Sequence, residues 1–241
     1  MGSLSPLKIA ILINNPPAQP LWTDIKNSYI SSLAHASPDA ETTFYDPIST
    51  TYPDPKDYDV IILSGGKADA SSTAPWVLNE LDFIRGLVTR YPNKKLVGMC
   101  FGHQAIARAL GGEVRTVPGG PVAAVRDIRL TEAGREFFSF AAGIGSFRVP
   151  KFHVREVAKP APGFVALAED NECFVNERNT ILSFQGHPEI LNDFARKMLL
   201  SDDREYTENS TQGGLNAEVE KLQKPTDGIE ILQRVVEWVR E

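Results

Sequence analysis

Residues 95–105 read KLVGMCFGHQA, an apolar run followed by a cysteine between two glycines. The run has the length and composition of a strand buried on both faces, and the residues after it suit a helix. Gly98 and Gly102 stand two residues before and after Cys100, a spacing that lets the backbone turn sharply and be approached closely. We predict a strand, a tight turn carrying Cys100, and a helix whose free N–H groups and dipole suit a reactive thiolate. The same pattern also fits a small buried residue beside helix-packing glycines.

Apolar strands and helices alternate on the N-terminal side of this stretch. Residues 7–14 and 59–66 read as buried strands, 41–46 as a shorter strand, and residues 22–33 and 75–91 as helices. This order predicts an α/β fold with a mostly parallel central sheet flanked by helices on both faces. Ligand sites in such sheets lie at the carboxyl ends of the strands, where both Ser64-Gly65-Gly66 and the Cys100 turn are found.

The texture of the sequence changes after residue 112. Short β-type pieces predict a small antiparallel β extension, and helices are expected at 187–200 and near the C-terminus, where apolar residues recur at helical spacing. The polar stretch 201–214, within the segment 201–225, is predicted to be a mobile surface segment, and the sequence leaves open whether residues 201–225 close over the site. With no internal repeat or domain boundary, we expect one domain over residues 1–241.

Charge and cysteine content narrow the function. The 25 Lys and Arg against 31 Asp and Glu give a net charge of −6, which argues against nucleic acid as a partner. The N-terminal apolar run is too short to cross a membrane and lacks a signal-peptide pattern, so no membrane role is expected. Two cysteines without a disulfide framework favour a cytoplasmic location. There the glycosylation sequon at Asn209 has no consequence.

A cysteine nucleophile needs a base, and His187 is the best placed of the four histidines. It follows the apolar strand TILSFQ, and Glu189 lies two residues further on, so Cys100, His187 and Glu189 are a candidate catalytic triad. The alternative is an ordinary helix start in which Glu189 serves the helix dipole. His35 is expected on the surface, and His103 is expected to face the sheet or to touch the substrate.

Neither a metal nor a cofactor is expected. The histidines are scattered, there is no Cys-x-x-Cys pair, and no glycine-rich loop has the pattern of a phosphate site. Cys173 is expected to be a packing residue in a strand.

Three motifs resemble the class I glutamine amidotransferase family. The nucleophile motif G-x-C-x-G-x-Q spans residues 98–104, the H-P-E motif stands at 187–189, and the glycine-rich oxyanion strand is Ser64-Gly65-Gly66. The resemblance implies a flavodoxin-like fold of the class I glutamine amidotransferase type.

The resemblance also implies a mechanism and site roles. Cys100 would attack a γ-glutamyl carbonyl, and the N–H groups of Gly66 and Phe101 would hold the oxyanion. His187 would protonate the leaving amine and then activate water against the γ-glutamyl thioester, oriented by Glu189. Gly65 and Gln104 would help position the glutamyl group.

One segment departs from the family pattern. Members often carry His-x-Asp-x-Val to hold the glutamine backbone, whereas residues 153–157 read HVREV, with His153 matching and Arg155 in the place of the acid. An arginine cannot grip an ammonium group, so the match does not predict recognition of free glutamine. We hypothesise that Arg155 meets a carboxylate on a longer γ-glutamyl substrate; equal losses by Arg155→Ala on glutamine and a γ-glutamyl peptide would contradict this. An exposed arginine at a strand edge is the alternative.

Stand-alone members with this layout resemble γ-glutamyl peptidases of specialised metabolism. The first reading is therefore a cysteine hydrolase that cleaves a γ-glutamyl amide in a glutathione-like conjugate. The second is a glutaminase subunit that delivers ammonia to a separate synthase, and the third is a non-catalytic binding module on the same fold. The H-P-E motif disfavours the related family of glyoxalase- and chaperone-like proteins.

Overall fold

The structure, a computed structural model, describes residues 5–201, 204–207 and 210–241. Its strands are β1 (Lys8–Leu12), β2 (Glu41–Tyr45), β3 (Val60–Leu63), β4 (Lys95–Met99), β5 (Glu113–Thr116), β6 (Val122–Arg129), β7 (Ser146–His153), β8 (Arg155–Lys159), β9 (Phe164–Ala166), β10 (Cys173–Asn176) and β11 (Ile181–Phe184). Its α-helices are α1 (Pro20–Ala36), α2 (Pro75–Arg90), α3 (Phe101–Ala109), α4 (Glu132–Phe137), α5 (Asn192–Leu199), α6 (Arg204–Thr207), α7 (Gln212–Lys221) and α8 (Gly228–Val239). Short 3₁₀ turns lie at Pro55–Asp57, Ser139–Ala141 and Glu169–Asn171.

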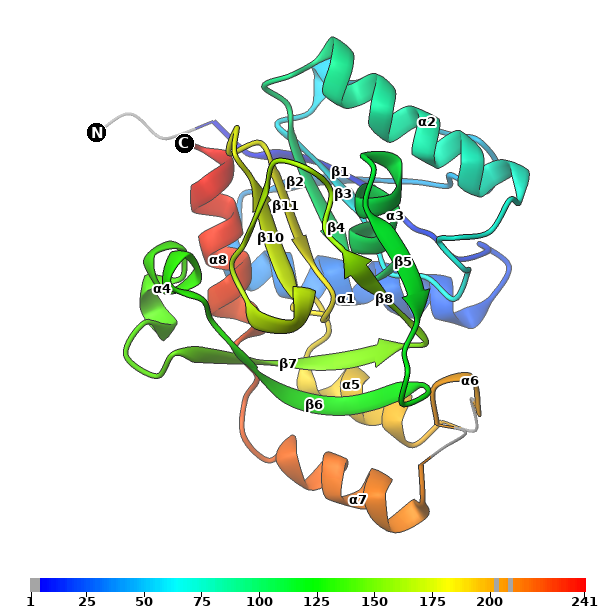
Figure 1. Cartoon of the computed structure of the whole chain (residues 1–241), viewed down its shortest axis with the longest axis vertical. Coiled ribbons are helices and arrows are strands. Elements are labelled where there is room, and N and C mark those ends of the chain that lie inside the picture. Colours follow the sequence, from blue (N-terminus) through cyan, green and yellow to red (C-terminus); the bar gives the residue numbers. More distant parts are fainter. Residues whose placement is uncertain (1–4, 202–203, 208–209) are drawn as a thin grey trace.

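A seven-stranded sheet in the order β2-β1-β3-β4-β11-β10-β9 forms the centre of the molecule (Figure 1). The five strands from β2 to β11 pair in parallel, and β10 and β9 extend the sheet in antiparallel pairing. Every residue of β3 is buried, as are the last four of β1, because both faces of these strands are covered. The predicted α/β fold with a mostly parallel sheet is confirmed.

Helices cover both faces of this sheet. Helices α1 and α8 pack on one face around the buried Tyr29 and Trp238, and α2 and α3 pack on the other around Leu81 and Ile106. These two layers hold most of the apolar core. Each large apolar side chain that becomes fully buried there contributes roughly 1.5–3 kcal/mol. α1 and α2 each begin with a proline, where the missing N–H is harmless.

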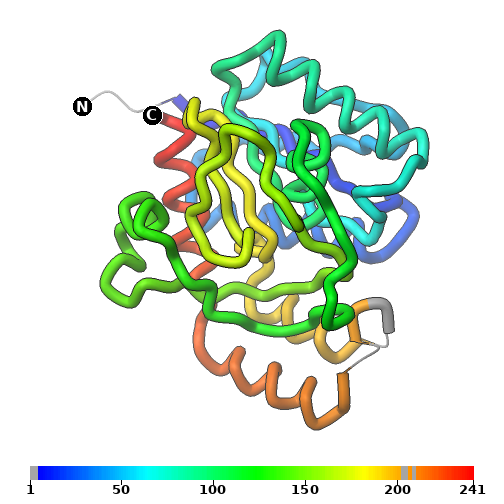
Figure 2. The backbone as a smooth tube through the Cα atoms, in the orientation of Figure 1, coloured from blue at the N-terminus to red at the C-terminus, as the bar shows by residue number. Residues whose placement is uncertain are grey.

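The antiparallel extension lies across the carboxyl end of the sheet. β6 pairs with β7 over eight residues, from Val122 with His153 to Arg129 with Ser146, and β5 pairs with β8. Figure 2 follows the chain along β6, through α4 and back along β7. β6 and β7 share an apolar cluster with α5 and α7. The extension thereby carries Phe152 and His153 to the end of β4.

Several elements differ from the sequence expectation. The helix expected to start at 187 starts at Asn192, because Pro188 disfavours helical backbone at His187, whose N–H donates to the Pro150 carbonyl (2.9 Å). α4 was not predicted; the Thr131 hydroxyl caps it by accepting from the Gly134 N–H (3.0 Å). Likewise, the segment 201–225 contains α6 and α7, where the sequence predicted no helix. Its mobility stays a prediction.

Cys100 and Cys173 are both free and buried. Within the described ranges, no helix is long and apolar enough to cross a membrane. Asn209 of the sequon lies outside the described residues.

Candidate active site

Cys100 stands at the turn between β4 and α3 and is held in an unusual backbone conformation. Its φ of 49° and ψ of −100° lie in a region that residues with side chains rarely adopt. A Cβ on Gly98 would lie 2.7 Å from the Gly102 carbonyl oxygen, and a Cβ on Gly102 would lie 2.4 Å from that of Leu63. Close backbone contact therefore requires glycine at both positions, as the spacing of Gly98 and Gly102 around Cys100 predicted.

The Cys100 side chain is buried, with 4% of the residue exposed. Its thiol donates to the Phe152 carbonyl at 3.5 Å, which ties the turn to the end of β7. The Cys100 N–H donates to the Phe184 carbonyl (2.8 Å), so the pairing of β4 with β11 continues into the turn. The residues after β11 are thereby brought next to the thiol.

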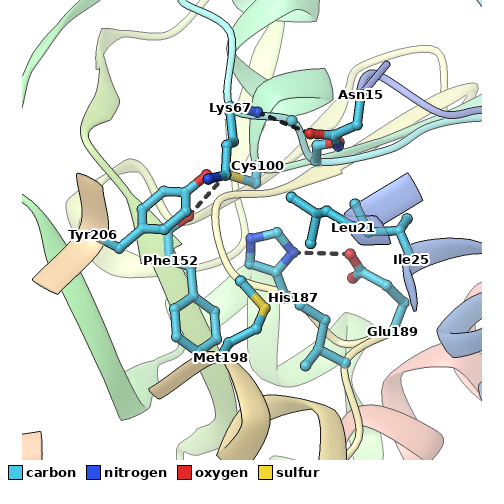
Figure 3. Close-up of a pocket in the computed structure, with 13 residues that line it drawn as sticks. Asn15, Leu21, Ile25, Lys67, Cys100, Phe152, His187, Glu189, Met198 and Tyr206 are labelled. Atoms are coloured by element: carbon cyan, nitrogen blue, oxygen red, sulfur yellow. Dashed lines mark hydrogen bonds and ion pairs between the residues drawn. The ribbon is translucent and has the colours of Figure 1, made fainter. Parts of the chain in front are cut away.

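His187 and Glu189 follow β11 and lie beside Cys100 (Figure 3). The His187 Nδ1 donates to the Glu189 Oε1 at 2.8 Å, and both side chains are buried. This bond leaves Nε2 as the nitrogen available to the reaction, and Nε2 has no hydrogen-bond partner among the described residues. The structure thus brings together the three residues of the predicted triad.

The charges around His187 favour its protonated form. Burial lowers the pKa of His187, but the negative charges of Glu189 and of an ionised Cys100 outweigh burial and raise that pKa well above its usual value. An imidazolium held in this way can give a proton to a leaving amine.

The loop after β3 places two glycines against the site. A Cβ on Gly65 would lie 2.6 Å from His187 Cε1, and a Cβ on Gly66 would lie 2.2 Å from the Asn14 carbonyl oxygen. The Asn15 side chain holds the loop, since its Nδ2 donates to the Gly65 carbonyl at 3.2 Å. Within the described chain, the N–H groups of Gly66 and Phe101 make no hydrogen bond, so both are available to an oxyanion.

The remaining predicted site residues lie together in a second part of the site. Gln104, His153 and Arg155 line a pocket of about 120 Å³ that also reaches Cys100. The Arg155 carbonyl accepts from Gln104 Nε2 (2.7 Å) and from His153 Nδ1 (2.8 Å). Burial, with the nearby charge of Lys151, lowers the pKa of His153 to about 3, so His153 is neutral at neutral pH.

Asp69 is the functional candidate that the sequence reasoning missed. Its Oδ2 pairs with the Arg155 guanidinium at 2.6 Å, on the wall of the same pocket. The available signal was its place three residues after Gly66, in a loop at the carboxyl end of a strand. Asn15 likewise stands in the loop that follows a strand, β1, whereas nothing in the sequence pointed to Tyr206, which also lines the site.

The space next to His187 is narrow. Leu21, Ile25, Ile190 and Met198 line it together with the candidate triad, and it leaves room for about one water-sized molecule. Tyr206 of α6 closes this side, where its ring meets that of Phe152 edge-on at 6.3 Å.

The other histidines and Cys173 lie outside both pockets. His103 accepts or donates at Ser183 Oγ (2.9 Å) and the Asn171 carbonyl (3.1 Å) and stacks on Phe174, so it faces the sheet. Burial lowers the pKa of His103 to about 3. His35 is exposed in the last turn of α1, and Cys173 is packed in β10. Among the residues that the structure describes, no group of three or more His, Cys, Asp or Glu is arranged to hold a metal.

Comparison with known proteins gives consistent matches. The family model described as glutamine amidotransferase class-I matches residues 21–204, more than half of the chain. A glutamine amidotransferase-like protein, chyE of Penicillium rubens, is 44% identical over the full length of both chains. Gamma-glutamyl peptidase 4 of Arabidopsis thaliana is 33% identical over 59% of each chain. The crystal structure of a glutamine amidotransferase from Thermotoga maritima superposes with a TM-score of 0.72 at 16% identity, over 98% of this chain and 99% of that one.

Proposed function

The chain belongs to the class I glutamine amidotransferase family, and from this premise we propose that it hydrolyses a γ-glutamyl amide through a thioester on Cys100. The observation that carries the proposal is the arrangement of Cys100, His187 and Glu189 at the ends of two adjacent strands. A thiol, an imidazole and a carboxylate in this order are the parts that acyl transfer from an amide needs.

The first half of the reaction forms the thioester. The Cys100 sulfur attacks the γ-carbonyl carbon, and the N–H groups of Gly66 and Phe101 receive the oxyanion. Each such donor is typically worth about 10²–10³-fold in rate. His187 gives the proton on Nε2 to the amide nitrogen, the C–N bond breaks, and ammonia or an amine leaves.

The second half releases glutamate. His187, now neutral, takes a proton from a water molecule, and the resulting hydroxide attacks the thioester carbon. The C–S bond breaks, which returns Cys100 to the thiolate and His187 to its protonated form. Glu189 accepts the hydrogen bond from the Nδ1–H of His187 throughout, so Nε2 faces the reacting atoms in both steps. The space for about one water beside His187 suits this step.

We place a γ-glutamyl conjugate of the glutathione type first as substrate, in specialised metabolism and in the cytoplasm. The similarity to a protein named gamma-glutamyl peptidase supports this assignment. A second candidate is a glutaminase subunit that supplies ammonia to a separate synthase, which the narrow space beside His187 favours because ammonia is about the size of water. The two candidates differ in the size of the leaving group, which is ammonia for a glutaminase and the amine of the remaining conjugate for a γ-glutamyl peptidase.

Glutamate release by purified protein tests the proposal. Wild type and Cys100→Ser are assayed on glutamine, glutathione and glutathione S-conjugates, with Cys173→Ala as the matched cysteine control. We expect Cys100-dependent release, largest on the conjugates for a peptidase and largest on glutamine for a glutaminase. Absence of release from every substrate by wild type would contradict both and favour a non-catalytic binding module.

A further inference from the structure

The pocket of about 120 Å³ beside Cys100 is lined by an anion and a cation in direct contact, Asp69 and Arg155. Asp69 Oδ2 and the Arg155 guanidinium are 2.6 Å apart, and their side chains are 32% and 29% exposed. Both therefore keep part of their surface open to the pocket. An exposed ion pair adds little to stability, so its position on the wall of a candidate site calls for an explanation other than folding.

Both charges are fixed in place by other contacts. Asp69 Oδ1 accepts from the N–H and from the hydroxyl of Ser71, at 2.7 and 2.5 Å. Arg155 donates to Thr116 Oγ1 at 3.2 Å, and Gln104 holds its backbone carbonyl. Gln104 is on α3, one turn past Cys100, so the position of Arg155 is linked to that of the nucleophile. Charges fixed before binding lose little freedom when a ligand arrives.

The other basic residues that line this pocket leave Asp69 as its anion. His153 is neutral at neutral pH, because burial lowers its pKa to about 3. Lys67 adds a positive charge, and its Nζ lies 5.8 Å from the centre of the Tyr206 ring. The only carboxylate that lines this pocket, among the described residues, belongs to Asp69.

A pair of opposite charges in contact matches a ligand that carries opposite charges on one carbon atom. An α-amino acid group is such a ligand: its ammonium suits a carboxylate, and its carboxylate suits the two-pronged guanidinium. We propose that Asp69 binds the α-ammonium and Arg155 the α-carboxylate of the glutamyl unit whose γ-carbonyl faces Cys100. This assignment rests on the proposed γ-glutamyl activity. It also accounts for Arg155 standing where family members have an acid, since Asp69 supplies the acid from another loop.

Substrates that lack one charged group test the assignment. Wild type, Asp69→Asn and Arg155→Met are compared on L-glutamine, on glutaramate, which lacks the α-ammonium, and on 4-aminobutanamide, which lacks the α-carboxylate. We expect wild type to prefer glutamine over each analogue at least tenfold in kcat/KM. Asp69→Asn should lose at least tenfold in kcat/KM on glutamine and almost nothing on glutaramate, which has no ammonium for Asp69 to bind. Arg155→Met should lose at least tenfold in kcat/KM on glutamine and almost nothing on 4-aminobutanamide, which has no carboxylate for Arg155 to bind.

A merely structural ion pair gives a different result. Loss of kcat/KM by the same factor on all three substrates would overturn the assignment, because a displaced loop affects each equally. The control is Asp127→Asn, which removes one partner of the exposed Asp127–Arg148 pair (2.8 Å) and should leave all three values unchanged.

Binding measurements separate this assignment from the proposed reaction. The same proteins are titrated with L-glutamate, glutarate and 4-aminobutanoate, with no turnover required. Tight binding of L-glutamate alone, lost selectively in the two variants, would uphold the assignment even if wild type hydrolysed nothing. Equal binding of the three acids, or no binding of any, would overturn it.

Discussion

Replacement of Glu80 by Gln is predicted to stabilise the protein above about pH 5. Glu80 is on α2 and is fully buried, and neither carboxyl oxygen has a hydrogen-bond partner among the described residues. Burial raises the pKa of Glu80 to about 8, and contact with the Asn14 side chain offsets only part of that effect. At neutral pH the folded protein therefore keeps this carboxyl protonated, and glutamine has nearly the same shape.

The size and sign of the effect follow from proton binding. In the unfolded chain Glu80 ionises near its ordinary pKa of 4.5, whereas in the folded protein it ionises only near 8. Between these values the folded state holds one proton more, so the free energy of unfolding falls by about 1.4 kcal/mol per pH unit. This amounts to roughly 3 kcal/mol at pH 7 and about 5 kcal/mol above pH 8. Below pH 4.5 the contribution vanishes.

Urea unfolding, followed by the fluorescence of the three tryptophans, measures this difference from pH 5 to pH 8.5. The gap in unfolding free energy between Glu80→Gln and wild type should widen as the pH rises. Glu237→Gln, at an exposed position on α8, is the control and should show no such trend. A gap that stays constant with pH, or that favours wild type increasingly at high pH, would mean that Glu80 is ionised and stabilised in the fold.

Two further substitutions test the site and its scaffold. Glu189→Gln should lower kcat/KM on the hydrolysed substrate by about 10²–10⁴-fold. It should also move the limb of the pH profile that belongs to His187 to lower pH, since the Glu189 charge raises the His187 pKa. A limb that does not move would contradict the pairing of Glu189 with His187. Gly102→Ala should cost about 1–3 kcal/mol in thermal unfolding, because the new methyl would lie 2.4 Å from the Leu63 carbonyl oxygen. Gly119→Ala, with nothing within 4 Å, should change stability little, and equal losses in the two variants would contradict the packing argument.

The fold was largely predictable because its strands are apolar on both faces. Residues 7–14, 59–66 and 95–100 read as buried strands, and β1, β3 and β4 lie within them. The candidate triad was predictable for a related reason: Cys100 and His187 each follow such a strand, and parallel neighbours end at the same edge. Their catalytic roles stay predictions.

Other features depend on contacts that a sequence pattern does not show. Pro150 lowers the strand signal of β7 and is tolerated there because β7 pairs with a single strand, β6. In α7, Gly213 and Gly214 of the first turn lower the helical signal. Asp69 becomes part of the site only through its ion pair with Arg155, which is far away in the sequence. Such a pair arises from the three-dimensional arrangement of β8 and the loop after β3.

Intact mass measurement during turnover shows whether the reaction passes through a γ-glutamyl thioester on Cys100. Wild type is mixed with its γ-glutamyl substrate, quenched in acid within the first turnovers, and digested to locate any adduct. We expect a mass increase of one γ-glutamyl group on Cys100 and none on the buried Cys173, which serves as the internal control. Glutamate release without an adduct on Cys100, or undiminished release by Cys100→Ser, would contradict a thioester on Cys100.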